Sequence, residues 1–321
     1  MRQTIKTHKF LLASLLVLFI GRLLQVTLQS PSMTGYDYGF YRFSSLYPNA
    51  LSIKHFFTGI FGGFDHIILA ILGQFGHIDI LLVSSIALWS ILSGWLMFLV
   101  CKPFGTKTAG LAVVLLTFSI AQSQVVSFFL WKTAIGLPLL LLFILALQKK
   151  KYLLTITTLL GLLITHTTSL LIAGLIFATH SLDFLFKKDK TNLLIITIFT
   201  LLGTILITAN QDAVNAFLHY PNQTAYQGIF LDPWYYLVRQ WPIVLTAVFG
   251  IAIFLKRSLT STFTSLFIFS FLWVAFAMPF SQRMVLYFDL SAIFFASHAL
   301  TLLPKKYYAN ILIPAFIVAY S

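Results

Sequence analysis

The sequence predicts an all-α, polytopic membrane protein, and two observations support this fold class. The 321-residue chain is 59% hydrophobic, 16% aromatic and only 9% charged, with a mean hydropathy of +0.92, whereas a soluble domain carries roughly 25% charged residues. Its apolar residues also form runs of the length that crosses a bilayer, about 20 residues in a helix. We therefore expect a single transmembrane domain over residues 1–321, in contact with the lipid bilayer.

The apolar runs predict about eleven transmembrane helices. The first run is too long to be a signal peptide, and it lacks the small-residue cleavage site that a signal peptide has. The run from Tyr152 to Leu182 is long enough for two shorter spans that turn near His166. In chain order the expected spans are Phe10–Leu28, Ile80–Cys101, Ala109–Phe129, Thr133–Leu147, two within Tyr152–Leu182, Leu193–Ala209, Pro242–Leu255, Thr262–Met278, Val285–Leu303 and Ile311–Tyr320.

Clusters of basic residues predict the orientation of these spans, because Lys and Arg accumulate in cytoplasmic loops. All clusters fall on one side of the membrane if Tyr152–Leu182 crosses twice, and the N-terminus is then cytoplasmic. The net charge of +13 is thus spread over short loops, and we expect no nucleic-acid partner. The cytoplasmic residues are Arg2, Lys6, Lys9, Lys102, Lys107, Lys149, Lys150, Lys151, Lys187, Lys188, Lys190, Lys256, Arg257, Lys305 and Lys306.

Two long loops are expected on the outer side, at residues 29–79 and 210–241. The first is apolar in its middle but is interrupted by Gly62 and Gly63, which favours two short interfacial helices over a further span. The second is rich in Tyr and Trp, which concentrate at membrane interfaces. Of the remaining basic residues, Arg22 lies within the first span, where it snorkels or packs between helices.

The most informative segment is Gly35-Tyr-Asp-Tyr-Gly-Phe-Tyr-Arg42, just beyond the first span. The chain has only 8 acidic residues, all of them Asp, so an aspartate at this point is a candidate for function. A carboxylate at the membrane surface can act as a base. An arginine five residues later can bind a phosphate or hold that carboxylate in place.

This segment and its position resemble the GT-C class of membrane glycosyltransferases. Asp37-Tyr-Gly-Phe-Tyr-Arg42 is similar to the Asp-Pro-aromatic-aromatic-x-Tyr-Arg segment of oligosaccharyltransferase catalytic subunits, and also to the Asp-bearing first outer loop of protein mannosyltransferases and lipid A aminoarabinose transferases. The chain departs from the first of these in lacking the proline and in having one residue fewer between Asp and Arg. Its next outer loop carries Lys132 where oligosaccharyltransferases carry metal-binding acids, as in the metal-independent relatives.

The resemblance implies transfer of a sugar from a polyprenyl-phosphate-linked donor to a glycan or protein acceptor, on the outer side of the plasma membrane. Asp37 is then the base. The residues implied to bind the donor, mainly through its phosphate, are Arg42, Lys132, His166, Arg239 and Arg283.

Each of these residues also has a structural interpretation. Asp37 and Arg42 could form a salt bridge that only folds the loop, and Lys132 and Arg239 could be interfacial anchors. Arg283 could pair with Asp289, a little under two helical turns away. A histidine such as His166 is more often a hydrogen-bonded packing residue.

Two other functions fit a polytopic chain. A lipid or solute transporter, or flippase, would show mid-membrane charges or paired broken helices, and no such repeat is evident in the sequence. An O-antigen polymerase or ligase would rely on outer arginines and a histidine. No cofactor is predicted, because the spacing in Asp65-His66 and His77-x-Asp79 resembles no recognised metal site.

Overall fold

The computed structural model describes residues 2–29, 42, 71–127, 130–187, 232–255, 262–276 and 281–304, together with 310, 313, 314 and 317. All regular secondary structure assigned in these ranges is helical, which confirms the predicted all-α class for this part of the chain. The elements are α1 (Arg2–Gln29), α5 (Ile78–Cys101), the 3₁₀ helix η2 (Lys102–Phe104), α6 (Thr106–Thr117), α7 (Ile120–Ser127), α8 (Trp131–Gln148), α9 (Tyr152–Thr165), α10 (Thr167–Lys187), α13 (Pro233–Arg239), α14 (Trp241–Leu255), α15 (Thr262–Ala275) and α16 (Ser281–Leu302).

The number of spans differs from the prediction of eleven. Among the described residues, four helices are long and apolar enough to cross a membrane, or six if each of two bent pairs counts as one span. The lower number arises because several predicted runs form shorter apolar helices, at Tyr152–Leu163, Thr168–His180 and Thr262–Ala275. The predicted span at Leu193–Ala209 and almost all of Ile311–Tyr320 lie outside the described residues. The long apolar helices are those of a multi-pass integral membrane protein.

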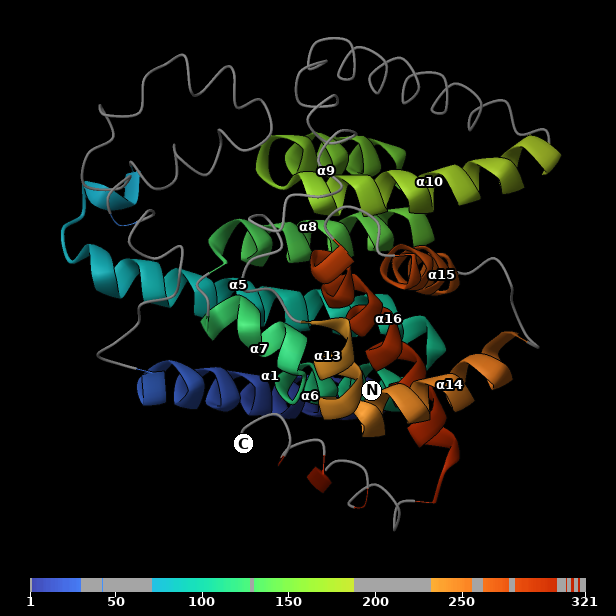
Figure 1. Ribbon diagram of the computed structural model, residues 1–321, viewed down its shortest axis with the longest axis horizontal. Helices are drawn as coiled ribbons and strands as arrows, with labels where there is room; N and C mark the ends of the chain where they lie inside the picture. Colours follow the sequence, from blue (N-terminus) through green and yellow to red (C-terminus); the bar gives the residue numbers. More distant parts are fainter. Residues whose placement is uncertain are drawn as a thin grey trace.

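Helices α1, α5, α8, α9 and α10 run roughly along the long axis of the molecule (Figure 1). Their contacts follow that order, since α1 packs on α5, α5 on α8, and α8 on both α9 and α10. Helix α16 crosses near the middle of the molecule and packs against α6, α14 and α15. The expected break in Tyr152–Leu182 is present at His166, between α9 and α10.

Contacts between helices show that the described molecule has two chemically different ends. The start of α8 meets His166, because Thr133 Oγ1 lies 3.2 Å from His166 Nε2. The α8–α9 turn, with Lys149, Lys150 and Lys151, is therefore at the opposite end of these antiparallel helices. Trp131 Nε1 donates to Ser85 Oγ over 2.7 Å, so the distant end of α5, which leads to Lys102 and Lys107, lies with the lysine turn. We call the end that contains His166 the polar end. We call the end that contains Lys149, Lys150 and Lys151 the lysine end.

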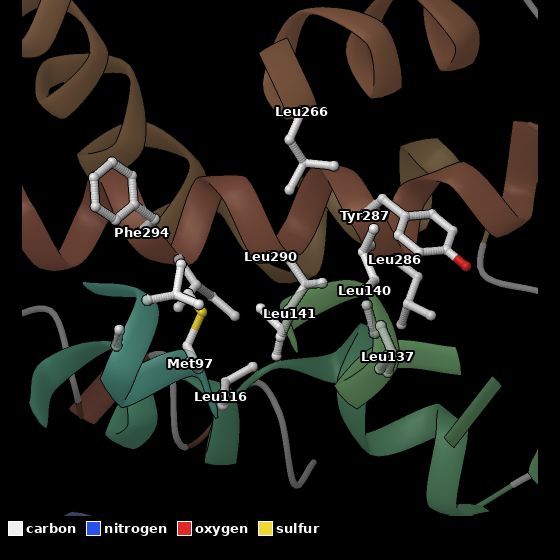
Figure 2. Close-up of a cluster of buried hydrophobic side chains, with 14 of the residues drawn as sticks. Met97, Leu116, Leu137, Leu140, Leu141, Leu266, Leu286, Tyr287, Leu290 and Phe294 are labelled. Atoms are coloured by element: carbon white, nitrogen blue, oxygen red, sulfur yellow. The ribbon is translucent and has the colours of Figure 1, made fainter. Parts of the chain in front are cut away.

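An apolar core joins α16 to the helices around it (Figure 2). Met97, Leu116, Leu141 and Leu290 are all buried there. Tyr287 lies at the edge of this core and directs its hydroxyl away from it (Figure 2). The apolar side chains thus close the centre of the molecule, and polar groups of α16 are left to neighbours nearer the polar end.

Glycines allow the closest helix approaches, as is common in membrane bundles. A Cβ atom on Gly250 of α14 would overlap the backbone carbonyl of Phe295 in α16. Gly94 and Gly110 receive the side chains of Leu18 and Phe10 from α1 in the same way. These contacts fix α1 and α14 against the helices that carry the polar residues described next.

Candidate functional site

Asp37, the predicted base, lies outside the described residues. Arg42 is described, and its Nε donates to Asp79 Oδ1 over 2.8 Å. Asp79 lies in the first turn of α5, where a carboxylate is favoured by the helix dipole. The two side chains are 48% and 53% exposed, so their ion pair contributes at most about 1 kcal/mol. Arg42 is thus held at the start of α5.

Arg239 lies in the last turn of α13. Its guanidinium carbon is 5.2 Å from the centre of the Tyr235 ring, which is a cation–π distance. Trp234 of the same helix is 76% exposed. The short helix therefore presents aromatic and basic side chains together, as an interfacial anchor does.

Three of the predicted binding residues come together at the polar end. Lys132 is in the first turn of α8, Arg283 is in the first turn of α16, and His166 joins α9 to α10. The positive charges of Arg283 and Lys132 both act on the His166 ring. Lys132 and Arg283 are partly exposed, whereas His166 is buried. We call these three residues, with Thr133, Ser169 and Tyr287, the His166 cluster.

Hydrogen bonds fix the orientation of the His166 ring. The backbone N–H of Ser169, which can only donate, lies 3.3 Å from Nδ1. Nδ1 is therefore the acceptor of a neutral ring, and Nε2 carries the proton that it donates to Thr133 Oγ1. The Ser169 hydroxyl lies 2.8 Å from Nδ1 and 2.7 Å from the Tyr287 hydroxyl. Both ring nitrogens are thus used inside the protein, in the arrangement of a packing histidine.

The electrostatics agree with a neutral ring. Burial, and then the charges of Arg283 and Lys132, lower the pKa of His166 from its ordinary 6.5 to about 3. The positive charge of the cluster therefore comes from Lys132 and Arg283, and His166 holds the helix ends that carry them. A pair of cations on two helix starts is suited to an anion such as a phosphate.

A second polar group surrounds Asp289 of α16, which is 0% exposed. The pairing with Arg283 that the sequence left open as an alternative is not formed, and Asp289 bonds to other helices instead. Oδ2 accepts from Ser119 Oγ over 2.7 Å and from Gln122 Nε2 over 3.1 Å, and Oδ1 accepts from the Tyr236 hydroxyl over 2.8 Å. We call these four residues the Asp289 cluster.

The Asp289 cluster lies where two bent helix pairs meet. The bend between α6 and α7 is 50°, and that between α13 and α14 is 87°. Ser119 lies in the first break and accepts from the backbone N–H of Gln122 over 3.1 Å. Gln240 lies in the second break and donates to the carbonyl oxygen of Phe118 over 3.3 Å. The two breaks are therefore bonded to each other as well as to α16.

Sequence reasoning missed this junction. A signal was available, because Ser119, Gln122 and Ser123 interrupt the apolar run at Ala109–Phe129. Such polar residues within a span often satisfy backbone groups that a break has freed. The pairing of this break with Asp289 required tertiary structure, since they are 170 residues apart in the chain.

Arg22 packs between helices, which was one of its two expected arrangements. It is 2% exposed, and its guanidinium donates to Gln25 Oε1, Ser123 Oγ and the carbonyl oxygen of Leu116 over 2.8, 3.0 and 2.9 Å. A charge inside a span is costly unless it is compensated. Arg22 therefore ties α1 to α6 and α7.

No group of three or more His, Cys, Asp or Glu residues that could hold a metal ion occurs in the part of the chain that the structure describes. Comparisons with protein-family models, with curated proteins and with solved structures find no match to this chain.

Proposed function

We propose that this chain is a GT-C-like glycosyltransferase, which transfers a sugar from a polyprenyl-phosphate-linked donor to a glycan or protein acceptor at the outer face of the plasma membrane. The observation that carries the proposal is that α8 and α16, whose first turns carry Lys132 and Arg283, both contact His166, through Thr133 and Tyr287. These cations belong to the end of the molecule opposite the lysine turns, and lysine-rich turns mark the cytoplasmic side. A lipid-linked phosphate lies at the corresponding depth of the outer leaflet.

The reaction is a substitution at the anomeric carbon of the donor sugar. The acceptor oxygen forms the new bond to that carbon, the bond from the carbon to the phosphate oxygen breaks, and Asp37 takes the acceptor proton. Polyprenyl phosphate then leaves with the electron pair. Lys132 and Arg283 stabilise the negative charge that develops on the leaving phosphate, and the planar guanidinium of Arg283 can bind it through two hydrogen bonds.

The remaining predicted residues have supporting roles in this proposal. His166 is a positioning residue, because its neutral ring joins α8, α10 and α16 through Thr133, Ser169 and Tyr287. Arg42 and Arg239 would guide the anionic headgroup from the membrane surface. Arg42 does so beside Asp79, and Arg239 beside the exposed aromatic residues of α13.

A transporter or flippase is the second candidate, and one observation favours it. Transporters bind their substrates and coupling ions at discontinuous helices, and two bent helix pairs meet at the buried Asp289. A transporter would move its lipid or solute without breaking a glycosidic bond. A flux assay in vesicles therefore separates it from the transferase.

The test uses purified protein in nanodiscs, with wild type compared to Asp37→Asn and Asp79→Asn. Each is incubated with labelled polyprenyl-phosphate and polyprenyl-diphosphate sugars, with and without EDTA, and sugar transfer or release is measured. We expect turnover by wild type and Asp79→Asn that is lost in Asp37→Asn. The EDTA arm reports whether a metal ion takes part.

Two outcomes would contradict the proposal. Equal turnover by Asp37→Asn and wild type would remove Asp37 as the base, and loss in Arg239→Ala alone would then indicate a ligase-like enzyme. Donor binding with no turnover, accompanied by lipid movement in vesicles, would indicate a transporter.

A further inference from the structure

The carboxyl group of Asp289 is held at a junction of three parts of the chain. Its oxygens accept hydrogen bonds from Ser119 and Gln122, at the start of α7, and from Tyr236 of α13. It lies six residues beyond Arg283 in α16, which is about 9 Å deeper along a helix. Ionisable groups at such depth are rare and usually have a function.

The charges around Asp289 come from few residues. Helices α14 and α15 pack on α16 and contain no ionisable side chain, and α7 contains none. The ionisable side chain of α6 is Lys107, which lies at the lysine end. In α13, the Tyr236 side chain faces Asp289, whereas Tyr235 and Arg239 lie on more exposed sides of the helix. On α16 itself, Arg283 and Tyr287 belong to the His166 cluster and His298 lies near Phe254 and Phe294, toward the lysine end. Arg22 of α1 acts on Asp289 across the polar residues of α7.

Two influences on Asp289 oppose each other. Removal from water disfavours the carboxylate, whereas three donors and the charge of Arg22 favour it. Proton relays in membrane proteins use carboxyl groups in such surroundings. We propose that Asp289 is a proton-binding site at the junction of the two helix breaks.

Binding of the proton converts the carboxylate to a neutral carboxylic acid, which must donate its new O–H. Tyr236 can accept it, because a phenol oxygen both donates and accepts, and its bond to Oδ1 links α13 to α16. Oδ2 already accepts from two donors, Ser119 and Gln122, so a proton on that oxygen would displace one of them. The proposal therefore places the proton on Oδ1, where its arrival reverses the hydrogen bond between Tyr236 and Asp289.

A small cavity provides a polar neighbourhood for this site. It measures about 20 Å³ and is lined by Arg22, Ser90, Ser93 and Gln122 together with apolar side chains. This volume accommodates about one water molecule. A water there would connect the Arg22 guanidinium to Gln122, and through Gln122 to Asp289.

The experiment is infrared difference spectroscopy of the full chain in nanodiscs, titrated from alkaline to acid pH in H₂O and D₂O. The chain has 8 acidic residues and no glutamate, so a protonated carboxyl band can be assigned by single substitutions. We expect a band of a buried carboxylic acid in wild type and in Asp79→Asn, and its loss in Asp289→Asn.

Tyr236→Phe keeps the carboxyl group and removes one hydrogen bond, so it tests the assignment even if Asp289→Asn does not fold. The band must then change frequency, because the C=O stretch depends on hydrogen bonding. A band that survives in Asp289→Asn, that is unchanged in Tyr236→Phe, or that is absent from wild type at all pH values would overturn the proposal. Asp289 would then be a permanently ionised counter-ion of Arg22. This test is independent of whether the chain transfers sugars.

Discussion

The His166 cluster and the Asp289 cluster share helix α16 but handle charge in opposite ways. The first holds two cations, Lys132 and Arg283, around a neutral imidazole, and both cations are partly exposed. The second is buried, and the carboxylate of Asp289 is compensated by three donors and by Arg22. Burial explains the difference. A net charge is tolerated where its side chains are partly exposed, whereas a fully buried charge must be balanced within the protein.

The largest effect is expected from Asp289→Ala. This change removes the buried acceptor of Ser119, Gln122 and Tyr236. Leaving one buried donor without an acceptor costs about 1–3 kcal/mol, and three donors lose their acceptor here, so the loss in free energy of unfolding in detergent should be several-fold that of an exposed pair. Asp79→Ala, which breaks the exposed pair with Arg42, is the control and should cost no more than about 1 kcal/mol. Similar losses for the two variants would contradict the contrast between the clusters.

The packing of the His166 cluster can be tested with Gly136→Ala in α8. The added Cβ would lie 2.8 Å from both His166 Cβ and Ser169 Oγ, and such overpacking costs about 1–3 kcal/mol. Gly174→Ala in α10 is a matched control, because nothing lies within 4 Å of its Cβ position. Replacing a helical glycine there should stabilise the protein by about 0.5–1 kcal/mol. If Gly136→Ala behaves like Gly174→Ala in thermal unfolding, His166 is not held as tightly as described.

A further effect develops gradually and concerns the pH dependence of stability. Because the pKa of His166 is about 3 in the folded protein, the unfolded chain binds the proton first as pH falls below about 6.5. The stabilisation that His166 contributes to the free energy of unfolding is therefore complete above a pH of about 6.5. It is lost as pH falls toward about 3, by up to about 1.4 kcal/mol per pH unit. The difference between wild type and His166→Gln in unfolding free energy should follow this course. A difference that grows instead as pH falls would mean that the ring is protonated in the folded state.

Much of the helical framework is predictable from local sequence. The apolar runs predict the helices that carry Lys132 and Arg283, and the lysine-rich turns distinguish the two ends of the molecule. His166 is correctly expected at a break between helices, because Thr and His interrupt the apolar run there. These features depend on neighbouring residues, so one sequence suffices to find them.

The partners of buried polar groups are not predictable in the same way. Asp289 is close enough to Arg283 along a helix to suggest a pair, but its bonds go to Ser119, Gln122 and Tyr236. The bends in α6–α7 and α13–α14 also make tertiary contacts, because Ser119 in the first break donates to Asp289 and Gln240 in the second break donates to the carbonyl oxygen of Phe118. Periodicity predicts which residues face inward and does not predict which helices meet.

The most direct test of the proposed anion site is binding of a polyprenyl monophosphate to the protein in nanodiscs. We would compare wild type with Lys132→Ala, Arg283→Ala, the conservative Arg283→Lys, and Lys149→Ala in the lysine turn as a control. Loss of a charged hydrogen bond costs about 1.5–3 kcal/mol, so each alanine variant at the polar end should bind about ten- to a hundredfold more weakly, with Arg283→Lys in between. Lys149→Ala should bind as wild type does. Wild-type affinity in both Lys132→Ala and Arg283→Ala would contradict the central claim that these two cations hold the phosphate of the donor.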